Sequence, residues 1–114
     1  MHELSVMASL LETVEEHAHK ADAKKVLSIN LIVGERTSFV DDSLLFYFDT
    51  LTPGRLSEGA KLNIQRTPMR FHCNTCDTDY QPEVGHFRCP VCNQPGQITS
   101  DGSEFLIESM EIET

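Results

Sequence analysis

Apolar residues recur at steps of three or four along the first twenty positions, which is the spacing of one face of an α-helix. Acidic residues of this stretch fall on the other faces, and the apolar set comprises Leu4, Met7, Leu10, Leu11, Val14 and Ala18. Residues 26–33 follow a different pattern, with an apolar side chain at every second position from Leu27 to Val33. Such alternation predicts a strand with one buried face, and Gly34 ends it.

A second helix is predicted where Asp41 and Asp42 precede the dense apolar run SLLFYFDTL. An aspartate suits the N-cap position of such a helix, because its side chain can accept a hydrogen bond from the first free amides. Pro53 and Gly54 close the run. The many bulky side chains indicate that this helix is buried against a sheet.

Two further strands are predicted at residues 61–67 and 104–112. If they pair with each other in antiparallel fashion, they bring together the ends of the segment between Pro68 and Gly102. That segment is poor in aliphatic residues and rich in Gly, Pro, Asn and Asp, so it cannot form an apolar core alone. The middle of the chain is therefore predicted to be an insertion into a small domain.

The predicted fold class is α/β of the α+β type: a small antiparallel sheet of about three strands with two helices, carrying an inserted module. The expected domains are an α/β domain at residues 1–68 with 103–114, and the inserted domain at residues 69–102. A chain of 114 residues suits one such core and a small appendage.

The charge balance narrows the possible partners. The chain has 9 lysines and arginines against 18 aspartates and glutamates, a formal charge of −9 with neutral histidines. Nucleic-acid binding draws its affinity from clustered basic residues, so no nucleic-acid partner is expected. No apolar run approaches the roughly 18 residues that cross a bilayer, and the start does not resemble a signal peptide, so a cytoplasmic protein without a membrane partner is expected.

Four cysteines in a reducing compartment indicate metal binding or redox chemistry rather than disulfides. They form two C-x-x-C pairs, separated by twelve residues: Cys73 with Cys76, and Cys89 with Cys92. A two-residue gap lets both sulfurs of a tight turn face one ion, and two such turns complete a tetrahedron of thiolates. This closed set is typical of structural Zn²⁺, whose binding would supply folding free energy to a segment with little core. The inserted module at residues 69–102 is therefore predicted to be a zinc ribbon and a zinc-binding domain.

Three other interpretations of the cysteines agree less well with the sequence. A thioredoxin-like redox pair needs one C-x-x-C at the start of a helix, whereas both pairs here lie in turn-rich sequence. A rubredoxin-like iron site uses the same thiolates, although the short spacing favours a zinc ribbon. A nucleic-acid-binding ribbon lacks its charge, because residues 70–100 hold two arginines against three acidic residues.

Histidines offer weaker signals. His72 adjoins the first cysteine pair and His86 lies three residues before the second, so either imidazole could replace a thiolate, although two exposed loop histidines are the simpler interpretation. His17 and His19 are interpreted as solvated helix residues, because a two-residue spacing puts them on different helix faces. No catalytic triad, phosphate-binding glycine loop or acid/base pair is found, and no enzymatic turnover is expected.

The first three residues, Met1, His2 and Glu3, allow a chemical interpretation beyond a helix start. A free α-amine, the His2 amide nitrogen and its imidazole can wrap around one metal ion, leaving a fourth in-plane position for a Glu3 backbone or carboxylate donor. Tetragonal nitrogen and oxygen sets of this kind suit Ni²⁺ and Cu²⁺. The simpler alternative is that Glu3 only stabilises the start of the helix, because its negative charge interacts favourably with the positive pole of the helix dipole.

The order of these motifs is specific. The sequence has MHE at its start, then LIVGER, DDSLLFYFDTL, C-x-x-C and C-P-x-C. It resembles, over essentially its whole length, the HypA/HybF family of nickel metallochaperones for [NiFe]-hydrogenase maturation. The resemblance implies a nickel site at Met1, His2 and Glu3.

Further ligand and partner assignments follow from the resemblance alone. An acidic residue after the first strand contributes to nickel binding in some members, which corresponds best to Asp41 or the adjacent Asp42; helix capping is the simpler role for both. The four cysteines are implied to hold structural zinc, and no firm role passes to His72 or His86.

The implied function is delivery of Ni²⁺ to a hydrogenase large-subunit precursor, together with a HypB-type GTPase and, where a host has urease, urease accessory proteins. A homodimer is an open alternative for the oligomeric state. The competing function is a zinc-ribbon protein-interaction module without a nickel role. Metal analysis of protein with an unmodified N-terminus separates the two.

Overall fold

The computed structural model describes residues 3–83 and 85–114. Its elements are α1 (Glu3–Lys20), β1 (Lys25–Gly34), α2 (Asp41–Leu51), β2 (Lys61–Thr67), β3 (Arg70–Cys73), β4 (Thr78–Tyr80), β5 (Gln97–Ser100) and β6 (Phe105–Glu113). The chain divides into two compact units. We call them the helical unit (Met1–Leu31, Ser38–Gln65 and Leu106–Thr114) and the cysteine unit (Ile32–Thr37 and Arg66–Phe105). The assignment of nickel and zinc to separate domains stays a prediction.

The larger sheet has the strand order β2-β1-β6. Lys24 N–H bonds to Glu113 and Gly34 N–H to Glu104, so β1 and β6 run in opposite directions. The predicted pairing of residues 61–67 with 104–112 is therefore wrong, because β1 lies between these two strands. β1 is the most apolar of the three and takes the position that is paired on both edges.

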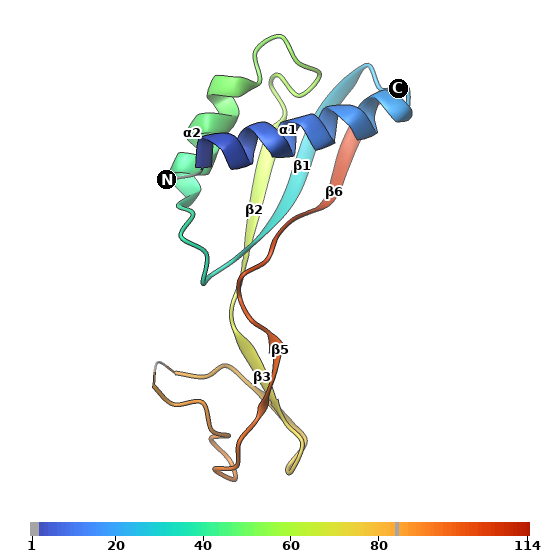
Figure 1. Ribbon diagram of the computed structural model, residues 1–114. Coiled ribbons are helices and arrows are strands. Elements are labelled where there is room, and N and C mark those ends of the chain that lie inside the picture. The colour runs from blue at the N-terminus through green and yellow to red at the C-terminus, as the bar shows by residue number, and fades with distance from the viewer. Residues whose placement is uncertain (1–2, 84) are drawn as a thin grey trace. The chain divides into compact units, whose positions relative to one another are not determined.

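The core of the helical unit lies where α1, α2 and the sheet meet. α1 contacts α2, and Figure 1 shows α1 crossing the strands and meeting α2 near its N-terminal end. The fully buried apolar side chains of this unit include Met7, Leu11, Val14, Ile29, Leu31, Leu44 and Phe48. Each side chain of this size contributes about 1.5–3 kcal/mol when fully buried. The predicted amphipathic helix and buried strand face are thus confirmed in their main positions.

Three local expectations were wrong. Leu4 was expected on the apolar face of the first helix with Met7 and Leu11 but is 51% exposed. Leu27 was expected on the buried face of β1 but is 43% exposed, while Val26 is fully buried. The cause lies outside the strand, because Val26 N–H bonds to the Leu56 carbonyl, which displaces the alternation at this end. The predicted aspartate cap of α2 is also absent, because Val40 occupies the N-cap position. Both aspartates lie in the first helical turn, where their negative charge interacts favourably with the positive pole of the helix dipole.

The cysteine unit contains a second sheet of order β4-β3-β5. β3 pairs with β4 in antiparallel fashion, with His72 opposite Asp79 and Cys73 opposite Thr78. Its buried cluster is small and consists of Phe71, Cys73, Tyr80 and Cys89. The Tyr80 hydroxyl donates a 2.7 Å hydrogen bond to the Phe87 carbonyl, which ties the second cysteine loop to this sheet.

Among the described residues, no helix combines enough length with enough apolar character to pass through a bilayer.

Candidate metal centre

The first cysteine pair lies in the hairpin between β3 and β4. Cys73 is the last residue of β3, and the chain turns through residues 74–77 before β4 starts at Thr78. Asp77 completes the turn with a φ of 57°, a left-handed conformation that aspartate tolerates better than most residues. The turn therefore brings Cys73 and Cys76 to one end of the hairpin.

The second pair forms a similar turn. Asn93 N–H bonds to the Cys89 carbonyl at 2.8 Å, and Cys89 N–H bonds to the Gln94 carbonyl at 2.9 Å. Asn93 adopts a φ of 61°, which allows the chain to reverse directly after Cys92. Val91 N–H also points at the Cys89 sulfur, 3.4 Å away. An amide directed at sulfur stabilises a thiolate, so this turn is shaped for a metal ligand.

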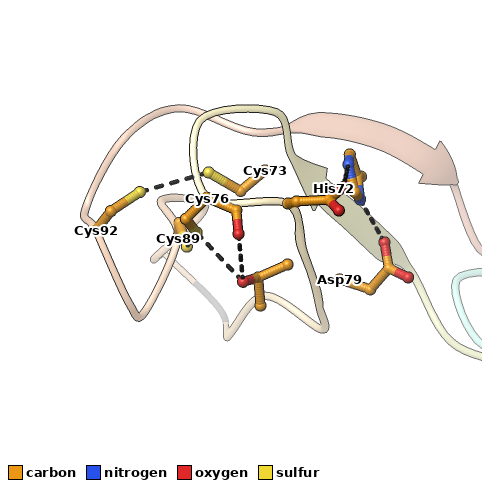
Figure 2. A network of polar contacts seen from close by, with 8 residues as sticks. His72, Cys73, Cys76, Asp79, Cys89 and Cys92 are labelled. Atoms are coloured by element: carbon orange, nitrogen blue, oxygen red, sulfur yellow. Dashed lines mark hydrogen bonds and ion pairs between the residues drawn. The ribbon is translucent and has the colours of Figure 1, made fainter.

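The four sulfur atoms converge. They all lie within 4.8 Å of one another, and two pairs, Cys73 with Cys92 and Cys76 with Cys89, are 3.4 Å apart. Figure 2 shows the cysteines gathered at one end of β3. In a tetrahedron with metal–sulfur bonds of about 2.3 Å, the sulfurs are about 3.8 Å apart. The donor set and its spacing therefore fit one tetrahedral ion, and all four cysteines are free thiols.

The protein environment favours thiolates unequally. The Cys76 backbone N–H holds the pKa of Cys73 at about 6, against the usual 9.0, and the Cys92 backbone N–H lowers the pKa of Cys89. Although the Gln94 backbone favours the Cys92 thiolate, burial and the neighbouring thiols raise the pKa of Cys92 to about 12. In each C-x-x-C pair the first cysteine has a lowered pKa, and a bound cation would favour ionisation of the full set.

His72 is held by aspartates. Its Nδ1 lies 2.6 Å from Asp79 Oδ1, and its Nε2 lies 3.2 Å from Asp77 Oδ1. The hydrogen bond to Asp79 raises the pKa of His72 above the usual 6.5. Figure 2 shows this imidazole directed toward Asp79, and the group with metal-ligand geometry within residues 3–83 and 85–114 contains only the cysteines. His86 is exposed and pairs through its backbone with Glu83.

The predicted nickel ligands are described only in part. Met1 and His2 lie outside the described residues. Glu3 is the first residue of α1 and is 2% exposed, and its Oε1 has no hydrogen-bond partner among the residues described. Asp41 is half-buried at the start of α2, and the adjacent Asp42 is exposed.

Sequence reasoning missed the polar residues around the cysteines. Thr78 Oγ1 lies 3.2 Å from the Cys76 sulfur, and this contact lowers the pKa of Cys76, whereas the Cys89 thiol and burial raise that pKa above its usual value. Asp77 and Asp79 bracket the His72 ring. A usable signal existed, because a tight hairpin closed by the first C-x-x-C necessarily puts residue 79 opposite residue 72.

Comparison with known proteins decides the family. A family model described as "Hydrogenase/urease nickel incorporation, metallochaperone, hypA" matches residues 1–112. The chain belongs to the HypA family. A hydrogenase maturation factor HypA of Caldanaerobacter subterraneus subsp. tengcongensis is 40% identical, with 99% of this chain and 100% of the relative aligned.

Solved structures of the family have the same fold. The solution structure of the nickel metallochaperone HypA from Helicobacter pylori superposes with a TM-score of 0.67 at 28% identity, covering 99% of this chain and 98% of that one. A second solution structure of a HypA protein gives 0.71 at 30% identity, covering 98% and 96%. This chain is thus a HypA-type nickel metallochaperone of hydrogenase and urease maturation with a four-cysteine metal site, and the family is not an enzyme family.

Proposed function

We propose that this HypA family member binds Ni²⁺ through its N-terminus and delivers it to the precursor of a [NiFe]-hydrogenase large subunit. The ligands are the Met1 amine, the amide and imidazole nitrogens of His2, and Glu3. A HypB-type GTPase takes part in the transfer, and a host with urease adds urease accessory proteins as partners. Four reduced cysteines fit a cytoplasmic setting.

The state of Glu3 supports this proposal most directly. A carboxylate with a buried, unpaired oxygen costs about 1–3 kcal/mol or more, because it has lost water without gaining a partner. The first amides of α1 lack intrahelical acceptors, so backbone nitrogen donors are available at the same place. A cation bound at this end compensates the carboxylate, although it must overcome the positive pole of the helix.

Asp41 is proposed as a further nickel ligand. α2 contacts α1, and Asp41 begins α2 as Glu3 begins α1. A second carboxylate would offset the helix pole and complete an oxygen and nitrogen ligand set, which suits Ni²⁺.

The four cysteines are proposed to hold Zn²⁺ with a structural role. Four thiolates leave no open coordination position, so the ion stabilises the fold and does not act on a substrate. Their mutual distances fit a tetrahedral ion, and the small buried cluster around Phe71 and Tyr80 leaves much of the stability of this unit to the metal.

The nickel proposal is tested by calorimetric titration of the untagged, zinc-loaded protein. His2→Ala should abolish high-affinity Ni²⁺ binding, and Glu3→Gln should weaken it. His19→Ala is the matched control, because His19 is an exposed imidazole on the same helix. Zinc content should be unchanged in all three variants. Nickel affinity unchanged in His2→Ala would contradict the proposal.

Delivery is tested separately by transfer. Nickel-loaded protein is incubated with the purified large-subunit precursor, with and without the GTPase, and the nickel content of each protein is measured after separation. Acetylating the N-terminal amine should reduce nickel binding and transfer while zinc stays in place. Equal transfer by the acetylated protein would exclude the amine as a ligand, and light scattering on the same samples tests for a homodimer.

A further inference from the structure

Helix α2 has two apolar faces. Leu44 and Phe48 are buried in the core of the helical unit. The neighbouring Leu45 and Phe46 point away from that core and are 38% and 63% exposed. Because the core is complete without them, packing within this unit does not explain the second face.

Aspartates flank the exposed apolar pair on the same stripe. Asp42, Leu45, Phe46 and Asp49 follow the spacing i, i+3, i+4 and i+7, which places them on one side of a helix. All four are exposed, and we call them the α2 outer face. α2 holds three aspartates and no basic residue, so nothing on the helix balances this charge.

Asp49 has no evident role in helix stability. It lies in the last turn of α2, where a negative charge meets the negative pole of the helix dipole and is unfavourable. No residue three or four positions away is basic, and Asp49 makes no hydrogen bond or ion pair among the residues that the structure describes. An unfavourable charge beside an exposed Phe points to recognition rather than folding.

The apolar pair is partly ordered in advance. The ring of Phe46 meets that of Tyr47 edge to face, with centroids 5.3 Å apart. Such pairs hold an aromatic side chain in place, so little entropy is lost when a partner covers it. Aromatic anchors of this kind supply much of the energy of protein interfaces.

We propose that the α2 outer face docks the protein that receives the nickel, through an apolar groove edged by lysine or arginine. A helix that lays apolar side chains into a groove is a recurring mode of recognition, and here Leu45 and Phe46 are the apolar anchors while Asp42 and Asp49 lie at the ends of the stripe. A second copy of this chain is a poor occupant, because antiparallel pairing of the two faces would set Asp42 against Asp49. The assignment to the recipient rests on the proposed function: α2 contacts α1, which begins at Glu3, so docking here brings the recipient to the nickel-binding end.

The first test removes the aromatic anchor. Binding of the purified large-subunit precursor is measured by calorimetry with Phe46→Ser and with the control Leu106→Ser, which removes an apolar side chain that is 46% exposed on β6. We expect Phe46→Ser to weaken binding about tenfold or more and the control to leave it within about twofold. Equal effects of the two substitutions would overturn the proposal.

The second test reverses a charge without harming the helix. Asp49→Lys puts a positive charge at the negative pole of α2, so helix stability should rise while precursor binding falls about fivefold or more at low salt. Glu108→Lys is the control, an equal charge reversal at an exposed position of β6. The difference between the variants should shrink at high salt. Undiminished binding by Asp49→Lys would overturn the proposal even if Phe46→Ser misfolds.

Measurements on the free protein separate the two proposals. Ni²⁺ titration of Phe46→Ser and Asp49→Lys should match the unaltered chain, because neither residue is a proposed ligand. Loss of GTPase binding alone, with precursor binding intact, would overturn the assignment to the recipient. If the unaltered chain binds Ni²⁺ but does not bind the precursor, both the delivery proposal and the docking proposal are wrong. If the unaltered chain binds the precursor but not Ni²⁺, only the nickel proposal is wrong, and the effects of Phe46→Ser and Asp49→Lys on precursor binding still test the docking proposal.

Discussion

The two units of this protein are stabilised in different ways. The helical unit buries large aliphatic and aromatic side chains from two helices and a sheet, among them Met7, Leu11, Ile29 and Phe48. The cysteine unit buries a cluster of only four residues, two of which are cysteines. Phe71 and Tyr80 pack with Cys73 and Cys89 in this cluster, and Phe87, whose ring stacks on that of Phe71, is 51% exposed.

The contrast indicates that a bound metal can take the place of a large apolar core. A short segment rich in turns cannot bury enough apolar surface to offset its conformational entropy. Zn²⁺ bound to the four converging thiols, as proposed above, would supply the missing stabilisation and make this unit dependent on metal and on pH. The helical unit contains none of these thiols and has a larger apolar core, so the two units should respond differently to the same treatments.

Removal of the metal should separate the units most clearly. A structural zinc ion contributes on the order of 10 kcal/mol to small domains. A strong chelator should therefore unfold the cysteine unit and leave the helical unit folded, because the latter keeps its apolar core. Amide NMR spectra would show the loss, with signals of residues 70–100 collapsing to unfolded positions.

Cys89→Ser should reproduce that pattern without chelator, since one missing thiolate opens the closed set. Persistence of the native signals of residues 70–100 after complete zinc removal would refute the assigned role of the metal.

A cavity in the apolar core should have the opposite distribution. Leu11 is 0% exposed, and Leu11→Ala should lower the free energy of unfolding of the helical unit by about 2–5 kcal/mol. Zinc stoichiometry, measured on the same samples as denaturant unfolding, should stay at one ion per chain. Leu4→Ala, at a half-exposed position of the same helix, is the control and should cost far less. Joint loss of zinc would show that the two units are not stabilised independently.

Loss of a partly buried polar contact in the helical unit should have a smaller effect. Glu15 of α1 accepts hydrogen bonds from Leu56 N–H at 2.9 Å and from the Ser57 hydroxyl at 3.1 Å. Glu15→Ala should cost about 1.5–3 kcal/mol, because it leaves the Leu56 amide without its charged acceptor.

The neighbouring residue provides the control for Glu15. Glu16 forms an exposed ion pair with Lys20 at 3.1 Å, so Glu16→Ala should cost at most about 0.5 kcal/mol in denaturant unfolding. Similar costs for the two alanine variants would argue against a specific role for the Glu15 contacts.

Much of the fold could be predicted from periodicity. The first helix, the second helix and the last strand appear within a residue or two of their expected limits. Two of the errors involve distant residues: Val26, next to Leu27, bonds to the Leu56 carbonyl, and β1 lies between β2 and β6. Periodicity within one segment does not say which other segment it pairs with.

Only some features of the candidate site could be predicted from the sequence. Convergence of the cysteines was predictable, because C-x-x-C spacing by itself fixes two sulfurs on one turn. The pairing of His72 with Asp79 could have been inferred from a tight hairpin at the first C-x-x-C but was missed, because residues 70–80 were not interpreted as a hairpin. The buried state of Glu3 could not be predicted, because a Glu at a helix start is ordinarily solvated.

The smallest expected effect concerns pH in the cysteine unit. The hydrogen bond from His72 to Asp79 raises the pKa of the imidazole above 6.5, so protonated His72 stabilises the folded unit. This contribution is complete below the unfolded pKa near 6.5 and disappears as the pH rises through the higher folded value. Asp79→Asn should lower the pKa of His72, as read from its ring signals in NMR titrations of zinc-loaded protein.

Asp77→Asn is the graded control for that titration, because Asp77 lies farther from the ring, at 3.2 Å against 2.6 Å, and is more exposed. It should shift the pKa of His72 downward by less. Acid acts on the thiolates in the opposite sense, since protons compete with the metal and weaken zinc binding as the pH falls. The unit should therefore gain from His72 and lose from its cysteines over the same acidic range. An unchanged pKa of His72 in Asp79→Asn would remove the imidazole from this balance and leave the metal alone to set the pH response.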